Sequence, residues 1–139
     1  QEIPIKTSPK EIKWFSQSPL FTQGSELSWV GASGAKGIES IIIPTGNAAT
    51  SETLYTIRLI FSEPDDIKVN ERLIDISIQK QLVSEGLDII KEASGKNKVF
   101  IKEYKNIKLN NELIIELKTN AKATEKETIL CGVEMVAEK

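Results

Sequence analysis

The chain has 139 residues and a formal net charge of −2. That length suits one domain, residues 1–139, with a sizeable apolar core. The slightly acidic balance gives no basic field for nucleic acid, and no apolar run approaches the roughly 18–20 residues that a membrane helix needs.

Histidine is absent and there is a single cysteine. Without histidine, the chain lacks the usual activator of a serine nucleophile and the commonest zinc ligand. Cys131 has no partner for an internal disulfide. It lies in the apolar run 128–133, which predicts a buried, unreactive thiol.

The first part of the chain predicts short strands separated by polar segments. Residues 1–13 are polar, contain two prolines, and are predicted to form a linker or an edge segment. A short strand is predicted at 26–30. Three glycines within 31–37 favour a loop, and 38–43 is an apolar strand that ends at a proline.

The most informative segment follows. Residues 54–61 are rich in Tyr, Thr, Ile and Leu, which suit a pleated, half-buried surface. Pro64, Asp65 and Asp66 end this strand with turn chemistry. A second apolar strand at 73–78 contains Asp75. An unpaired acid there would be costly, so we expect Asp75 to accept hydrogen bonds from backbone groups of an adjoining loop.

The remaining strands are short. They are predicted at 80–83 and 87–93 around a Glu85-Gly86 turn, at 97–104 with a continuation after a bend, at 112–118 and at 129–136. Gly86 and the β-branched Ile89-Ile90 pair argue against a helix in 82–93. About ten short strands with turns between them and no convincing helix predict an all-β, antiparallel jelly-roll β-sandwich.

These motifs resemble the malectin family of carbohydrate-binding domains, which have a galactose-binding-like fold. The family pattern of a strand ending Phe-Ala-Glu, a variable loop, and a hydrophobic-Phe-Asp-Val strand is matched by 61–63 and 73–76. A Leu-Asp-Ile step at 87–89 and a last strand carrying Cys131 continue the match, which covers 38–136. The resemblance implies a sandwich that needs no metal and binds sugar without catalysis.

The ligand set of the family is not matched. Where the resemblance implies sugar-binding aromatics after Phe-Ala-Glu, this chain has Asp65 and Asp66. Near another family aromatic it has Gly34 and Ala35, and near a family aspartate it has Lys126 or Glu127. The family's specificity for short glucose oligomers is therefore not carried over.

Acidic residues crowd one part of the chain, namely Glu63, Asp65, Asp66 and Asp75. Three interpretations are open. The first is a solvated acidic loop, the second is a structural cation site, and the third is a pair of glycosidase carboxylates. No phosphate-binding glycine loop, EF-hand spacing or nucleophile-elbow motif is present.

A sugar site is predicted at one end of the sandwich, formed by the loops 31–37, 64–70 and 121–127, because loops on a rigid scaffold usually carry function. Trp29 would offer a stacking face, although its strand spacing also suits a core position. Asp65 and Asp66 would accept hydrogen bonds from hydroxyls, and Lys126 would donate to ring or acidic oxygens.

The predicted function is a non-catalytic carbohydrate-binding module, appended to a secreted or surface bacterial glycan-active enzyme. The alternatives are an accessory domain that packs on a catalytic domain without binding sugar, and a free-standing enzyme. No cofactor, no metal, no nucleic acid and no membrane insertion are expected. The partners would be an oligosaccharide or polysaccharide and other domains of the parent, in a secreted, periplasmic or cell-surface location.

Overall fold

The computed structural model describes the backbone of residues 6–8, 13–16, 27–44, 54–109 and 111–138, and the side chains of 36–43, 54–109 and 111–138. Its elements are β1 (Lys6–Ser8), β2 (Lys13–Ser16), β3 (Leu27–Lys36), β4 (Ser40–Pro44), β5 (Leu54–Phe61), β6 (Leu73–Ile78), β7 (Gln81–Asp88), α1 (Ile89–Ala93), β8 (Phe100–Lys108), β9 (Glu112–Thr119) and β10 (Ile129–Ala137).

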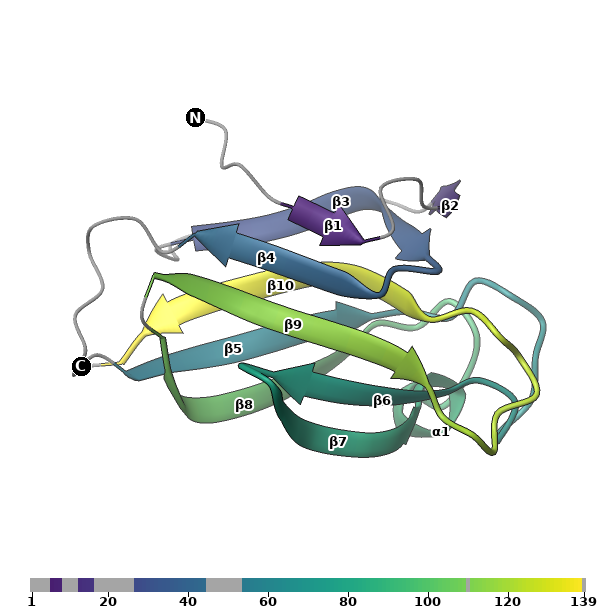
Figure 1. Cartoon of the computed structure of the whole chain (residues 1–139). Helices are drawn as coiled ribbons and strands as arrows, with labels where there is room; N and C mark the ends of the chain where they lie inside the picture. The colour runs from purple at the N-terminus through teal and green to yellow at the C-terminus, as the bar shows by residue number, and fades with distance from the viewer. Residues whose placement is uncertain (1–5, 9–12, 17–26, 45–53, 110, 139) are drawn as a thin grey trace.

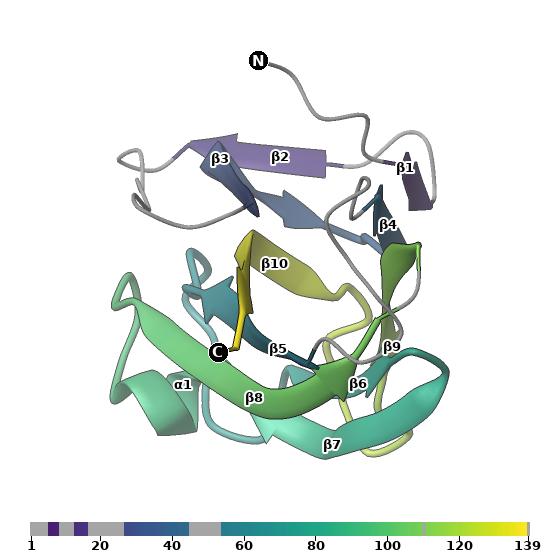
Figure 2. The same cartoon turned by 90° about the vertical axis from the view of Figure 1, so that its left-hand side faces the viewer.

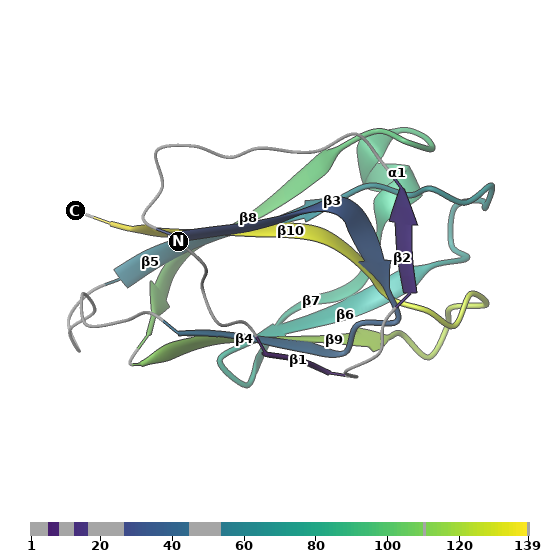
Figure 3. The same cartoon turned by 90° about the horizontal axis from the view of Figure 1, so that it is seen from above.

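The strands form two antiparallel sheets that lie as two layers (Figure 3). One sheet has the order β1-β4-β9-β6-β7 and the other has the order β2-β3-β10-β5-β8. Within the segment 1–13, predicted as a linker or an edge, residues 6–8 form β1, and Lys13 is the first residue of β2. β1 and β2 are edge strands, one in each sheet. The predicted antiparallel β-sandwich is confirmed.

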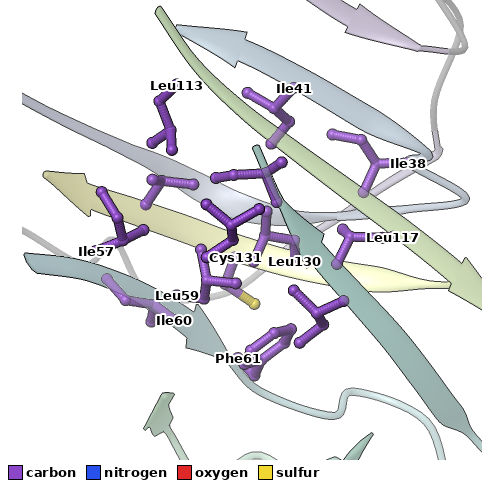
Figure 4. Close-up of a cluster of buried hydrophobic side chains, with 14 of the residues drawn as sticks. Ile38, Ile41, Ile57, Leu59, Ile60, Phe61, Leu113, Leu117, Leu130 and Cys131 are labelled. Atoms are coloured by element: carbon purple, nitrogen blue, oxygen red, sulfur yellow. The ribbon is translucent and has the colours of Figure 1, made fainter. Parts of the chain in front are cut away.

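The core lies between the sheets. In β6 and β9 every second side chain is buried, because successive side chains of a strand point to opposite faces. Figure 4 shows Leu113 and Leu117 of β9 gathered with Leu59 and Phe61 of β5. Cys131 is 1% exposed, and burial raises the pKa of its thiol to about 11. The prediction of a buried thiol is confirmed, and a raised pKa favours the protonated, less reactive form.

At one side of the sandwich the edge strands β7 and β8 lie next to each other (Figure 2). The hydroxyls of Ser84 on β7 and Tyr104 on β8 are 2.6 Å apart. This hydrogen bond joins the two sheets directly. β8 continues through the bend predicted after residue 104. Asn106, which has a positive φ, lies where the pairing of β8 with β5 shifts in register. The predicted bend is therefore confirmed.

The prediction of two strands around a Glu85-Gly86 turn is wrong. β7 is continuous, and it turns back from β6 at Gln79 and Lys80, whose φ values are 53° and 67°. Positive φ at both positions is the geometry of a tight hairpin turn. Gly86, with φ 67°, belongs to a β-bulge in which two residues of β7 oppose Asp75 of β6.

The prediction that 82–93 contains no helix is also wrong. Helix α1 begins after Asp88, whose Oδ1 accepts a hydrogen bond from the backbone N of Lys91 at 3.2 Å. Such a cap contributes about 1 kcal/mol, which exceeds the small helix penalty of the two β-branched isoleucines. Burial of Ile89 adds to this stabilisation.

The loop predicted at 31–37 is a strand over most of its length. β3 continues to Lys36 because it is paired on both sides, with β2 and with β10. Two ladders of backbone hydrogen bonds outweigh the weak strand preference of glycine. The chain turns only at Gly37, which has φ 79°.

Candidate functional site

Three connections meet at one end of the sandwich, on the right in Figure 1. They are 37–39 between β3 and β4, 62–72 between β5 and β6, and 120–128 between β9 and β10. The backbone N of Gly37 donates to Thr128 O at 2.8 Å, and the backbone N atoms of Thr124 and Glu125 donate to Glu71 O at 3.0 and 2.8 Å. These bonds fix the three connections against one another.

A buried ion pair lies under this end. Arg72 Nε donates to Glu63 Oε1 at 2.6 Å, and the two side chains are 2% and 0% exposed. Arg72 also donates from Nη2 to Asp65 Oδ2 at 2.9 Å and from Nη1 to Glu127 O at 2.5 Å. The guanidinium therefore joins the carboxylates of Glu63 and Asp65 and the backbone carbonyl of Glu127 through its fork of donors.

Asp65 has a second cation. Lys36 Nζ lies 2.7 Å from Asp65 Oδ2. The hydrogen bond from Lys36, together with the charge of Arg72, holds the pKa of the Asp65 carboxyl below its usual value, because both cations favour the ionised form. The interpretation of the acidic loop as simply solvated is wrong for Glu63, which is buried and paired.

Of the four residues predicted to bind sugar, Asp65 and Asp66 share one connection, whereas Trp29 and Lys126 lie on other elements. Asp65 is held in the ion-pair network, and Asp66 is exposed in the same connection. Trp29 is paired with Val133 near the start of β3, whereas Lys36, opposite Ile129, marks the strand's other end. Lys126 is exposed and lines a groove on an outer face of the sandwich.

This groove lies on the outer face of the β4-β9-β6-β7 sheet, which is nearer the viewer in Figure 1. Its volume is about 650 Å³. The residues that line it include Glu39, Asp75, Glu116, Lys118, Thr119 and Lys126. Asp75, Glu116 and Lys118 are outward-pointing positions of β6 and β9, Thr119 ends β9, and Glu39 and Lys126 belong to the connections at the end of the sheet.

A second hollow adjoins the groove. Its volume is about 600 Å³, and both are lined by Asp75, Lys118 and Thr119. It continues past the end of the sheet, where Glu85, Asn120 and Lys122 line it. We call the two together the outer-face groove.

Asp75 lies at the centre of the outer-face groove. Its Oδ1 accepts hydrogen bonds from the backbone N of Gly86 and from Asn120 Nδ2, both at 2.8 Å. The expected backbone hydrogen bond is therefore present, although its donor belongs to the β7 bulge. Asn120 Oδ1 accepts from the backbone N of Lys122 at 2.9 Å, so Asp75 also fixes the connection that follows β9.

The chemistry available in the outer-face groove is that of hydrogen bonding. Carboxylates, ammonium groups and the Thr119 hydroxyl line it, and none of the described lining residues is aromatic. Within the described ranges, no cluster of three or more His, Cys, Asp or Glu side chains could hold a metal ion. No helix of the described residues is long and apolar enough to cross a membrane.

Sequence reasoning missed several residues of these sites. Arg72 immediately precedes the strand predicted at 73–78, but no local pattern shows that its partner is Glu63. Asn120 and Lys118 were also missed as site residues. The available signal was the alternation in 112–118, which puts Glu116 and Lys118 on the same face of the strand. The register of β9 with β6 then sets them opposite Ser77 and Asp75.

Comparisons with known proteins agree with this architecture. The family model described as "Malectin domain" matches residues 47–138. A search of curated proteins gave no match. The extracellular domain of ANXUR2 from Arabidopsis thaliana aligns with a TM-score of 0.69 and 14% identity over 97% of this chain and 41% of its own. The plant receptor-like kinase FER aligns with a TM-score of 0.66 and 20% identity over 78% of this chain and 33% of its own.

A bacterial enzyme is also similar. β-Glucuronidase 2 of Bacteroides uniformis aligns with a TM-score of 0.61 and 18% identity over 95% of this chain and 15% of its own. At these identities the similarity to solved structures shows the fold, and this chain spans less than half the length of each neighbour. The match of the family model extends over more than half of the chain, from the residues before β5 through β10, and the chain therefore belongs to the malectin domain family.

Proposed function

We propose that this chain is a non-catalytic carbohydrate-binding module and that the glycan lies in the outer-face groove. The observation that carries the proposal is the groove itself: about 650 Å³ in its larger part, and lined by carboxylates, lysines and a hydroxyl. That volume is in the range of small-molecule sites. Carboxylates and ammonium groups supply the acceptors and donors that sugar hydroxyls require.

Non-catalytic binding is supported by the family, by the lack of histidine and by the pairing of Glu63 with Arg72. Malectin-like domains are in general non-catalytic binding modules. Histidine is absent from the chain. Glu63, which the glycosidase interpretation would use, is buried and bound to Arg72, so it is unable to reach a glycosidic oxygen.

The outer-face groove is a better place for sugar than the loop end because its polar groups are more available. At the loop end, Glu63 and Asp65 already bind Arg72 and Lys36. A glycan would have to compete with those cations. Of the predicted contacts, Lys126 belongs to the groove, and sugar contacts from Trp29, Asp65 and Asp66 stay a prediction.

Binding is expected to be weak. An aromatic platform would contribute about 1 kcal/mol per ring by analogy with aromatic pairs, and the described lining offers only one strongly exposed apolar side chain, Leu82 at 59%. The hydrogen bonds gained must offset the ordering of the sugar and of the lysine side chains. Avidity from several modules or from a tethered enzyme would raise the effective affinity.

We further propose a secreted, periplasmic or cell-surface location and a parent protein that acts on glycans. Two similar structures support this: one is an extracellular domain, and one is part of a bacterial β-glucuronidase. In both, the region similar to this chain is only part of a longer polypeptide.

The second candidate is an accessory domain that packs on a neighbouring catalytic domain without binding sugar. Val99 and Ile101, which are 50% and 52% exposed, favour it. Val99 lies just before β8 and Ile101 lies near its beginning, and β8 is an edge strand of its sheet. A contact there would remove apolar area from water.

Affinity electrophoresis through gels that contain polysaccharides tests the proposal. The wild-type chain should be retarded by at least one polysaccharide, and Lys126→Ala should reduce that retardation. Lys105→Ala is the matched control, because Lys105 is 68% exposed on β8, in the other sheet. Asp66→Ala tests the loop end separately. Retardation lost only with Asp66→Ala would move the site there, and no retardation by any polysaccharide would favour the accessory domain.

A further inference from the structure

Strand β7 contains a second irregularity, next to the hairpin turn. Leu82 is paired with Ser77 of β6, and the next pair along the strands is Ser84 with Ile76. Val83 is therefore an extra residue between two consecutive pairs, which is a β-bulge. Val83 packs against the core, and the Ser84 hydroxyl makes the hydrogen bond that joins the two sheets. Both side chains thus lie on the inner side of the strand.

The bulge places Leu82 on the outer face of the sheet. In a regular strand Leu82 and Ser84, two positions apart, would point to the same side. With the extra residue between them, Leu82 points the other way. It lines the larger hollow of the outer-face groove and is 59% exposed. Bulges re-aim side chains in this way and are common beside functional sites. An apolar side chain is therefore turned away from the core and into a hollow with polar walls.

Leu82 begins a row of side chains that crosses the sheet from its edge strand. Ser77 of β6 is paired with Leu82 on one side and with Glu116 of β9 on the other. All three residues line the same hollow. Neighbouring strands lie about 5 Å apart, so the row spans about 10 Å. The small side chain of Ser77 leaves room between its two longer neighbours, which makes one end of the row apolar and the other end a carboxylate.

This row is complementary to a sugar with an apolar substituent on one side and hydroxyls on the other. The Leu82 side chain is narrow and branched, so it suits a methyl group better than the flat face of a pyranose, which an aromatic ring would cover. A hydroxyl pressed against Leu82 would lose water without gaining a partner from that side chain. Ser77 and Glu116 supply donors and acceptors for the other hydroxyls. The exposed Lys80 lies 3.6 Å from Glu116 and pairs with it only weakly.

We propose that the outer-face groove selects a glycan residue that carries a methyl group, in a 6-deoxyhexose or an N-acetylhexosamine, and that Leu82 contacts this methyl group. The inference rests on the proposed glycan-binding function and specifies its ligand. Ser77 and Glu116 bind hydroxyls of the same sugar residue. Removing one methyl group from water favours the methyl-bearing sugar about fourfold over its hydroxylated counterpart.

The test is a titration of matched trisaccharides, followed by the amide shifts of the isotope-labelled chain, which measures weak affinities. An L-rhamnose trisaccharide is compared with the L-mannose trisaccharide of the same linkage, and an L-fucose trisaccharide with that of L-galactose. Each of these pairs differs only in the oxygen at C6. Chitotriose is compared with cellotriose, which has hydroxyls in place of the acetamido groups.

At least one methyl-bearing member should bind about fourfold more tightly than its counterpart. A preference within a C6 pair identifies the deoxy methyl group, and a preference for chitotriose identifies the acetyl methyl group. Raised sodium chloride should leave the preference unchanged, because no charged group makes it. A preference that disappears in salt would contradict the assignment to Leu82.

Variants of exposed leucines give the second arm. Leu82→Ala should bring the two members of the preferred pair to equal affinity, whereas Leu82→Met, which keeps an apolar side chain of similar size, should retain the preference. Leu54→Ala is the control, because Leu54 is 37% exposed at the start of β5 in the other sheet, and it should also retain the preference.

Two outcomes would overturn the methyl proposal and leave glycan binding intact. One is a preference that persists in Leu82→Ala. The other is a wild-type chain that a polysaccharide retards in the gel but that shows no preference in any of the three pairs. A chain that no polysaccharide retards and no trisaccharide binds would overturn both proposals.

Discussion

Arg72 donates from Nε to Glu63 Oε1 at 2.6 Å, and the two side chains are 2% and 0% exposed. Residues on either side of a connection, one just after β5 and the other just before β6, thus form a buried ion pair. Arg72 extends the link to Glu127 at the approach to β10. The pair fixes the loop end of the sandwich, and it does so with charges that are then unavailable to ligands.

Removing one member of this pair should destabilise the domain strongly. Arg72→Ala leaves the Glu63 carboxylate buried without its partner, which costs about 3–5 kcal/mol of unfolding free energy. Urea unfolding followed by tryptophan fluorescence measures it. Glu103→Gln is the control, because its ion pair with Arg58 is 36% exposed on both sides and such pairs contribute about 1 kcal/mol or less.

The double variant Glu63→Leu with Arg72→Met separates charge from packing. Replacing both charges with apolar side chains of similar size should recover most of the stability lost in Arg72→Ala. A single variant that unfolds at the wild-type urea midpoint would contradict the assignment of a buried, mutually dependent pair.

Asp65 gives the stability of the domain a dependence on pH. Lys36 and Arg72 lower the pKa of the Asp65 carboxyl from its ordinary 3.8, so the folded state holds the ionised form more strongly than the unfolded state does. The contribution is complete above about pH 4 and is lost as pH falls through the lowered pKa. The wild type should therefore be more stable than Asp65→Asn at neutral pH, with the difference shrinking below pH 4. A difference that stays constant from pH 7 to pH 2 would rule out this linkage.

Asp75 is expected to be structural. Asp75→Ala leaves the backbone N of Gly86 and the amide of Asn120 without their acceptor, which should cost about 1–3 kcal/mol. Ser77→Ala, two residues along the same face of β6, is the matched control and should cost much less. Equal urea midpoints for the Asp75 variant and the wild type would show that neither hydrogen bond stabilises the fold.

The fold is predicted to be independent of metal. The malectin resemblance implies no metal, and Glu63 and Asp65 at the loop end bind Arg72 and Lys36 instead. The melting temperature should be the same with and without EDTA. A fall of many degrees on adding EDTA would indicate a bound cation that stabilises the folded state, and would restore the structural cation interpretation.

The strands were predictable where alternation is clear. In β6 and β9 the buried and exposed positions follow the period of two that the apolar residues show in the sequence. β3 was not predictable over 31–36, because glycine, alanine and serine have little strand preference and the two neighbouring strands decide the outcome. Helix α1 is too short for a helical period to appear, and the only local signal is Asp88 as its cap.

The candidate site was predictable only in part. Family resemblance led to the connections that meet at one end, and Lys126 belongs to the outer-face groove. The pairing of Glu63 with Arg72 was not predictable, since it depends on how the 62–72 connection folds back. The groove itself depends on the register that places Asp75 opposite Lys118, and a single sequence does not reveal register between strands so far apart.

An amide chemical-shift titration of the isotope-labelled chain tests the central claim most directly. The ligand is an oligosaccharide of the polysaccharide that retards the chain most strongly in affinity electrophoresis. We predict that the amides of Asp75, Lys118, Thr119 and Lys126 shift with one common saturation curve while those of β8 stay in place. Shifts confined to 64–70, or to the outer face of the other sheet, would contradict the assignment of the outer-face groove as the glycan site.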